Sequence, residues 1–211
     1  RPISLCMKLK DKGKTDWLSI MNRHFYRAIK FSVAVCCATL SLAGCKSTPN
    51  PFIRTDADFS ALPADAMAEV AAYLEEQVRE GNRSPGLETR AGLILDTPEV
   101  AQALRSRAAR AQLIKELLDS GHSVEQSNGK IAIIRSSAYK KSGTRFDRDR
   151  NALIIISENR DRVILYESLR DANELKTAAR TAIEEIFFNE RKTALEPGHK
   201  YRIGGGEIQV R

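Results

Sequence analysis

Apolar residues recur every three or four positions along most of the chain after residue 62, which predicts a body built mainly of helices. The pattern covers four stretches, at residues 63–81, 97–121, 150–173 and 174–196. Thr97 and Pro98 suit the start of the second helix, because threonine caps helices and proline fits the first turn. Gly121 is expected to end that helix in the left-handed conformation. We interpret the third stretch as a helix, although its "ALIII" is also typical of a strand.

The period of the pattern changes in two places, which predicts short β-hairpins. "HSVEQSNGKIAIIRS" contains Asn128 and Gly129, a pair typical of a tight hairpin turn. "HKYRIGGGEIQVR" is expected to close the chain as two short strands around its three glycines. Between the first hairpin and the third helix, residues 139–150 are polar and basic and are interpreted as a solvated loop. The alternative is a loop that contacts lipid headgroups, glycan or another acidic surface. The expected fold class is therefore α+β, mostly helical, with about four helices and one or two short β-hairpins.

The longest apolar run of the chain ends at "LAGC", residues 42–45. The run "FSVAVCCATLSLA" follows a basic stretch that begins at Met21, and small residues precede Cys45, which is the order of a secretory signal. Its 13 residues are fewer than the roughly 20 that a membrane-spanning helix needs. Two other interpretations are a buried helix with a chance cysteine and cleavage at an A-x-A-like site without lipid.

Leu42, Ala43, Gly44 and Cys45 resemble the lipobox of bacterial lipoproteins. The resemblance implies that the Cys45 thiol carries diacylglycerol, that a signal peptidase cuts between Gly44 and Cys45, and that the new amino end is acylated. Two or more chains give stable anchoring, so the membrane is an expected partner and these covalent lipids are the only cofactor expected. Lys46 stands where an Asp would favour retention in the inner membrane, which implies the outer membrane, facing the periplasm.

These boundaries divide the chain into four segments. Residues 1–20 are interpreted as an upstream extension, because Met21 is a better beginning than Arg1. Residues 21–44 are the expected signal peptide. Residues 45–62 are rich in Ser, Thr, Pro and Asp and are expected to form a flexible tether. Residues 63–211 are expected to fold as a single small α+β domain.

The positive charge of the chain lies almost entirely in its first segments. The net charge is +7, but residues 1–44 hold eight basic and two acidic residues, which leaves 26 basic and 25 acidic residues over 45–211. Without the first 44 residues, charge no longer favours a nucleic-acid partner. No cysteine follows Cys45, so the body can form neither an internal disulfide nor a thiolate zinc cluster.

The body holds two histidines, His122 and His199, each of which follows a glycine. A metal ion would need a third ligand such as Glu125 or Glu207, and the spacing matches no metal-binding motif. We therefore expect no metal site and assign no catalytic residue.

Other polar residues of the helices have two interpretations each. The candidates for a binding groove are Arg160, Tyr166 and Asn173. Alternatively, Tyr166 belongs to the core, and the other two make surface or capping contacts. A solvated helix face is the expected place of Arg105, Arg107 and Arg110, and phosphate binding is their alternative role.

From about Arg105 onward, the order of features resembles the YdbL-like family of bacterial envelope proteins. Three stretches carry the likeness: "LIKELLDSGHSVEQSNGKIAI", "SENRDRVILYESLRDAN" and "ALEPGHKYRIGGGEIQVR". The second follows the family's helix motif through Asn159, Arg162, Tyr166, Leu169 and Asn173. The chain departs from the family at Val124, Arg170 and Ile208, where members have Gly, Ala and Trp. The resemblance implies a small periplasmic or lipid-anchored accessory protein with an envelope partner and no catalytic residues.

Together these features predict a lipid-anchored envelope protein that acts as a non-catalytic binding or assembly module. One alternative is an envelope hydrolase or glycan-acting enzyme, for which His122 and His199 are the candidate residues. Another is a lipid-handling protein, which requires an apolar groove between helices.

Overall fold

The computed structural model of the protein describes residues 62–211. These residues belong to one compact unit. The predicted lipobox, the predicted cleavage position and the predicted tether up to residue 61 lie outside the described residues. Between residues 62 and 211, no helix combines the length and the hydropathy needed to cross a bilayer.

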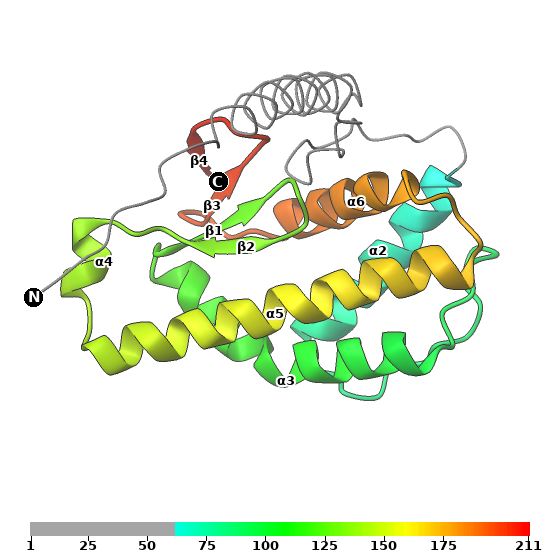
Figure 1. The fold of residues 1–211 in the computed structure, drawn as a ribbon, viewed down its shortest axis with the longest axis horizontal. Coiled ribbons are helices and arrows are strands. Elements are labelled where there is room, and N and C mark those ends of the chain that lie inside the picture. The colour runs from blue at the N-terminus through cyan, green and yellow to red at the C-terminus, as the bar shows by residue number, and fades with distance from the viewer. Residues whose placement is uncertain (1–61) are drawn as a thin grey trace, which may run out of the picture. The chain divides into compact units, whose positions relative to one another are not determined.

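The described part of the chain contains five helices and a four-stranded sheet (Figure 1). The helices are α2 (Ala64–Arg79), α3 (Pro98–Asp119), α4 (Ser137–Lys141), α5 (Arg145–Ala172) and α6 (Ala179–Thr193). The strands are β1 (Ser123–Gln126), β2 (Ile131–Ile133), β3 (Lys200–Arg202) and β4 (Ile208–Val210). This architecture confirms the predicted mostly helical α+β class. Both predicted hairpins form, and the parallel pairing of β1 with β3 joins them into one sheet of order β2-β1-β3-β4.

The predicted ends of α3 are confirmed. The Thr97 side chain accepts a hydrogen bond from the backbone N–H of Val100, and Pro98 occupies the first helical position. Gly121 follows the helix with a φ of 67°, a conformation that glycine adopts without a Cβ clash.

The predicted loop at residues 139–150 is wrong, because this segment forms α4 and the first turns of α5. Ser136 caps α4 by accepting from the N–H of Tyr139. Thr144 and Asp147 form a reciprocal capping box that begins α5. High polarity does not prevent helix formation here, because these local caps satisfy the first N–H groups and the charged side chains remain exposed.

Four helices and the sheet enclose the apolar core. Figure 1 shows α5 running the length of the domain, with α3 along one side and α6 and the sheet along the other. The main cluster joins Leu74 of α2, Leu104 of α3, Leu165 of α5 and Phe187 of α6, all of them fully buried. A second cluster, made of Ile114, Leu117, Ile131 and Ile155, packs β2 onto α3 and α5. The main cluster therefore holds the helices together, and the second cluster attaches the sheet to them.

One stripe of α5 holds distant segments in place by their backbones. The Asn159 amide accepts from the N–H of Ile131 at 2.9 Å and donates to its C=O at 2.8 Å. Asn173 makes the same pair of bonds to Ile94, at 2.8 and 3.1 Å. A carboxamide offers the donor and acceptor of a peptide group, so Asn159 closes the outer edge of β2 at Ile131.

Gly129 lies in the turn between β1 and β2, which packs closely against α5 and α6. Its φ is 75°, and a Cβ at this position would lie 2.8 Å from Cε2 of Tyr166 and 3.2 Å from Cβ of Glu184. Its carbonyl accepts from the Tyr166 hydroxyl at 3.1 Å and from Nη2 of Arg191 at 3.0 Å. The turn therefore requires glycine both for its backbone conformation and for this contact.

We predict that Gly129→Ala lowers the free energy of unfolding by about 2–4 kcal/mol, because the strained φ and the Tyr166 contact both add to the cost. Urea denaturation followed by circular dichroism measures the change. Gly204→Ala is the matched control, since its φ is 56° and no atom lies within 4 Å of the added Cβ. The control loses only the conformational part, about 1 kcal/mol. Equal losses in the two variants would contradict the steric role of the turn.

Candidate functional site

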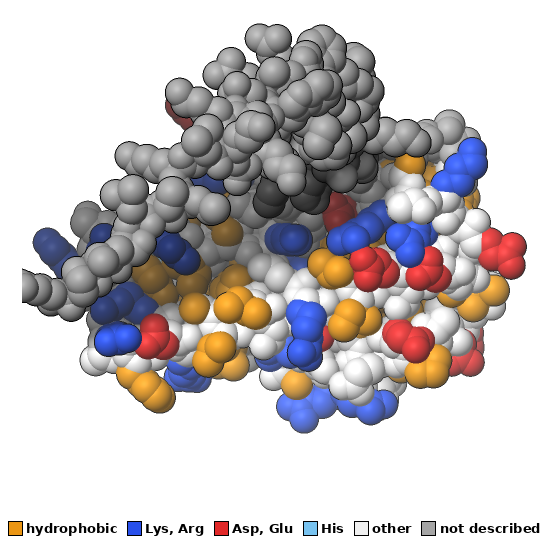
Figure 2. Space-filling view, in the orientation of Figure 1, with side chains coloured by type: hydrophobic (Ala, Val, Ile, Leu, Met, Phe, Trp, Pro, Cys, Tyr) orange, Lys and Arg blue, Asp and Glu red, His pale blue; other side chains and the backbone are white. Residues whose placement is uncertain are grey.

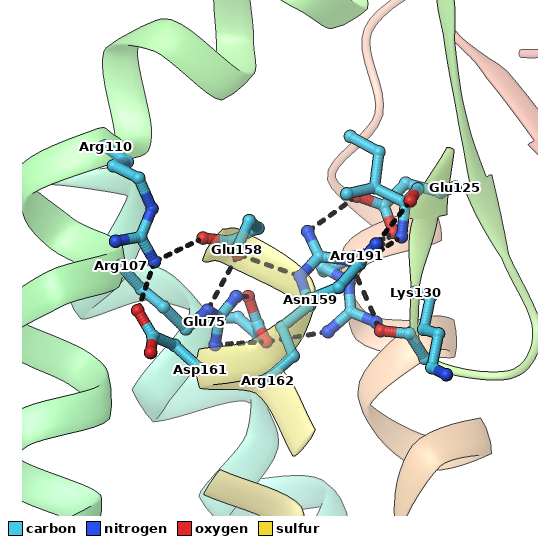
Figure 3. Close-up of polar contacts among 12 residues, drawn as sticks. Glu75, Arg107, Arg110, Glu125, Lys130, Glu158, Asn159, Asp161, Arg162 and Arg191 are labelled. Carbon is cyan, nitrogen blue, oxygen red and sulfur yellow. Dashed lines mark hydrogen bonds and ion pairs between the residues drawn. The ribbon is translucent and has the colours of Figure 1, made fainter. Parts of the chain in front are cut away.

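Six buried charged side chains form a closed ring in the interior of the domain (Figure 3). In order around the ring they are Glu75, Arg107, Glu158, Arg162, Glu125 and Arg191. They come from α2, α3, α5, β1 and α6, and none is more than 7% exposed. Acidic and basic residues alternate, so each guanidinium bridges two carboxylates and the ring as a whole is neutral. We call this set the ion-pair ring.

Two arginines make forked contacts in the ring. Nη1 and Nη2 of Arg107 donate to the two carboxylate oxygens of Glu75 at 3.1 and 2.8 Å. Nη1 and Nη2 of Arg162 donate to the oxygens of Glu125 at 2.8 and 2.9 Å. The Nε atoms of both arginines converge on Oε1 of Glu158, at 2.9 and 2.8 Å. Forked pairs of this kind fix the relative orientation of both side chains.

Arg191 closes the ring and joins it to the hairpin turn. Its Nη1 donates to Glu75 at 2.8 Å, and its Nε donates to Glu125 at 3.1 Å. The same guanidinium donates to the Tyr166 hydroxyl and to the Gly129 carbonyl, each at 3.0 Å. The position of the turn between β1 and β2 is therefore coupled to the ring.

The ring keeps its carboxylates ionised. Burial by itself raises the pKa of Glu75, but the positive charges of Arg107 and Arg191 outweigh burial and lower the pKa to about 2. Burial is likewise outweighed at Glu158, where Arg107 and Arg162 lower the pKa to about 2. At Glu125 the same balance lowers the pKa below its ordinary value. At neutral pH, these groups are fixed charges and hold no proton to transfer.

Arg107 and Arg110 correct the prediction that the α3 arginines lie on a solvated face. Arg107 is 1% exposed, and Arg110 bonds to Oε2 of Glu158 at 3.3 Å and to Asp161 at 2.5 Å. Only Arg105 is exposed as predicted. One signal was present in the sequence, because Arg107 follows Leu104 by three positions and so falls on the apolar stripe. The acidic partners are 32 and 51 residues away, beyond the reach of a local pattern.

A cavity of about 330 Å³ opens beside the ring. The buried ring residues lie at its floor. The side walls are mainly apolar and include Val78, Ala111, Ile114, Leu118 and Leu195. The exposed residues of its lining, which include Lys115 and Glu196, mark the mouth. A cavity with apolar walls, a few fixed polar groups and this volume has the character of a small binding pocket.

Four polar side chains form a hydrogen-bonded cluster at the mouth. Nε2 of His199 lies 2.8 Å from Oδ1 of Asp119, and the Lys115 ammonium bonds to Asp119 at 3.1 Å and to Glu196 at 2.8 Å. Hydrogen bonds from His199 and then from Lys115 lower the pKa of Asp119. Nδ1 of His199 accepts from the backbone N–H of Glu196 at 3.2 Å. The imidazole hydrogen therefore belongs on Nε2, which donates it to Asp119.

The mouth cluster also contains a set of metal-type ligands. Asp119, Glu196 and His199 offer ligand atoms that lie within 4.8 Å of one another. A metal ion on Nε2 of His199 would require the imidazole hydrogen to lie on Nδ1, which already accepts from the Glu196 N–H. The metal ion would also displace the Lys115 ammonium from Asp119 and Glu196. The geometry therefore favours a hydrogen-bonded cluster. Of the ligands considered from the sequence, Glu125 lies in the ring, and His122 packs edge-on against Tyr139 with ring centres 5.3 Å apart.

The structure does not gather Arg160, Tyr166 and Asn173 into one groove, and none of them lines the cavity. Tyr166 is fully buried and donates to Gly129, while Asn173 bonds to the backbone of Ile94. The Arg160 side chain is 75% exposed, with its Nε 3.7 Å from Asp161. Sequence patterns did not indicate Glu75, Glu158 or Arg191 as site residues, because each is one charged residue among many on its helix.

Comparison with known proteins did not place the chain in a family. No family model, no curated protein and no solved structure matches the chain. The YdbL-like resemblance therefore stays a prediction that rests on the residues that carry it. The structure gives four of those residues internal roles: Asn159 and Asn173 hold backbone segments, Arg162 belongs to the ring, and Tyr166 bonds to the hairpin turn.

We predict that Glu75→Gln lowers the free energy of unfolding at pH 7 by about 3–5 kcal/mol, because Arg107 and Arg191 then lose a buried counter-charge. Urea denaturation at pH 7 and pH 3 measures the effect. The pKa of Glu75 is about 2 in the fold against an ordinary value of 4.5, so its stabilisation is complete above pH 4.5 and is lost as the pH falls toward 2. The variant should therefore lose less stability on acidification than the wild type.

Glu76→Gln is the matched control for this experiment. Glu76 is the next residue of α2, is exposed and pairs with exposed Arg79. Its replacement should change the free energy of unfolding by less than about 0.5 kcal/mol. A ring variant no less stable than this control would show that the ring does not hold the helices together.

Proposed function

We propose that the chain is a lipid-anchored bacterial envelope protein whose domain acts as a non-catalytic binding or assembly module. The lipobox at residues 42–45 supports the anchor, with diacylglycerol and an acyl chain on Cys45. The proposed location is the outer membrane, facing the periplasm, with residues 45–62 as the tether. The proposed partners are the membrane itself and a second envelope protein, with no nucleic acid.

The observation that carries the binding role is the cavity beside the ion-pair ring. Forked ion pairs fix its floor, so little ordering is needed when a guest enters. An apolar side chain of a partner protein would contact Ala111, Ile114 and Leu195 on the walls. The charges at the mouth would then bind the polar groups beside that side chain, as in the centre of a protein–protein interface.

The chemistry of the lining favours binding over catalysis. The ring carboxylates are held ionised and each is paired with arginine, so they are unsuited to act as general acids at neutral pH. Both ring nitrogens of His199 are engaged, one by Asp119 and one by the Glu196 backbone. The carboxylates of the ion-pair ring and the imidazole of His199 are thus engaged in ion pairs and hydrogen bonds within the domain.

A second candidate is lipid handling, which the apolar walls of the same cavity favour. An acyl chain would lie against Val78, Ile114 and Leu118, with its polar end near Lys115. The two candidates differ in the class of molecule that occupies the cavity, so one cavity-filling experiment can separate them.

We predict that Cys45→Ser abolishes incorporation of radiolabelled fatty acid and releases the protein from the membrane fraction. The thiol is the proposed attachment atom for diacylglycerol, and the second proposed attachment, at the amino end, requires cleavage before this cysteine. A chain without lipid has no stable anchor. Cys37→Ser is the control, because Cys37 lies in the apolar run but outside the lipobox. It should label like the wild type. Labelling of the Cys45 variant, or an unlabelled wild type, would contradict the anchor.

We predict that Ala111→Trp removes the partner that co-purifies with the protein after gentle crosslinking and detergent extraction. Ala111 lines the cavity, and an indole there occupies the space that the guest needs. Ala109→Trp is the control on the same helix, since Ala109 is exposed and outside the cavity lining. Thermal unfolding checks that both variants fold. A co-purifying protein that survives the Ala111 change would contradict the site, and loss of a bound lipid instead would favour lipid handling.

A further inference from the structure

The first half of α5 exposes three large apolar side chains. Phe146, Leu153 and Ile156 are 76%, 64% and 62% exposed. At 100° per residue they lie on one side of the helix, opposite buried Ile155. Figure 2 shows hydrophobic side chains along the left half of α5, with basic side chains nearby. We call Phe146, Leu153 and Ile156, together with Arg145, Arg150 and Arg160 on the same side, the α5 face.

Positive charge is concentrated around this face. Residues 135–160 hold seven basic and three acidic residues, whereas residues 45–211 as a whole hold 26 and 25. One of the three acids, Glu158, is buried in the ring, so it does not offset the charge at the surface. Arg145 has an exposed partner, Asp149, at 3.7 Å, a contact that contributes little in water.

A shallow hollow of about 390 Å³ runs beside the face, between α3 and α5. Phe146, Leu153 and Ile154 make its lining mainly apolar. Arg110 and Arg150 add guanidinium groups to the lining, and Asp149, which lies 3.7 Å from Arg145, adds one carboxylate. Apolar side chains flanked by arginines are complementary to a phospholipid interface, where phosphate groups lie directly above acyl chains.

We propose that the α5 face docks on an anionic phospholipid surface. Phe146, Leu153 and Ile156 enter the boundary between headgroups and acyl chains, while the surrounding arginines and the α4 lysines contact phosphates. The inference rests on the proposed placement of the protein at a membrane, and it adds to the anchor a second contact that fixes the orientation of the domain. We favour this occupant over an acidic protein because three large apolar side chains are exposed among arginines on one helix, as in interfacial helices.

The test measures vesicle binding by the full chain carrying Cys45→Ser, so that no attached lipid contributes. Co-sedimentation with vesicles of phosphatidylcholine alone, or mixed with phosphatidylglycerol, should show on the order of tenfold tighter binding to the anionic mixture. The difference should shrink as salt is added. Every variant keeps the same amino-terminal segment, so differences between variants report on the domain.

The decisive variant is Phe146→Ser/Leu153→Ser/Ile156→Ser, which should weaken binding to anionic vesicles on the order of tenfold or more. The matched control is Ile94→Ser/Ile203→Ser/Val210→Ser, three residues that are 47%, 50% and 61% exposed elsewhere on the domain. The control should bind like the parent chain. Replacing Arg145, Arg150 and Arg160 by Gln should reduce the preference for anionic lipid relative to the parent chain. All of these side chains are exposed, and thermal unfolding checks that each variant folds.

Equal binding to neutral and anionic vesicles would overturn the proposal, as would equal losses in the variant and its control. Absence of vesicle binding, with crosslinks from the α5 face to an acidic protein, would replace the lipid by a protein partner. The anchor is tested separately by labelling of Cys45. Vesicle binding without labelling would refute the anchor and leave this inference standing.

Discussion

Six charges that would each be costly to bury alone are held in the interior as one neutral, closed ring. Every guanidinium needs two carboxylates, and every carboxylate needs two guanidinium groups. Because the members come from four helices and a strand, displacement of one element leaves charges without partners on two others. The ion-pair ring therefore couples the packing of α2, α3, α5 and α6 to the position of the hairpin. The Gly129 carbonyl takes part in this coupling, because it accepts a hydrogen bond from Arg191.

This constraint also shapes the cavity. A hydrophobic floor would be free to collapse or repack, whereas a floor made of forked ion pairs has one arrangement. The walls remain apolar, and the mouth is fixed by the hydrogen bonds among Asp119, His199, Lys115 and Glu196. A rigid pocket with an apolar interior and charged edges is suited to recognition, which is why the binding role is the one we propose.

The two halves of α5 differ in their contacts with the rest of the domain and with solvent. From Glu158 onward, one stripe of the helix bonds to β2, to the ion-pair ring and to the turn at Gly129, so this stripe is part of the interior. Before Glu158, Phe146, Leu153 and Ile156 face outward among arginines. A single helix that is fixed at one end and amphipathic at the other gives the domain a defined edge to present to a surface.

The sequence by itself determined the features that depend on near neighbours. The ends of α3, the turn at Asn128 and Gly129 and the helical class follow from caps, periodicity and turn residues within a few positions of one another. It also supplied the prediction of a lipobox, which rests on four adjacent residues. Only the tertiary structure decided that Arg107 is buried, that Asn159 closes a strand edge and that a cavity lies beside the ring. Those features join residues from 28 to 116 positions apart. In the sequence a charged residue that will be buried cannot be distinguished from an exposed one, because its partners are identified only when the chain is folded.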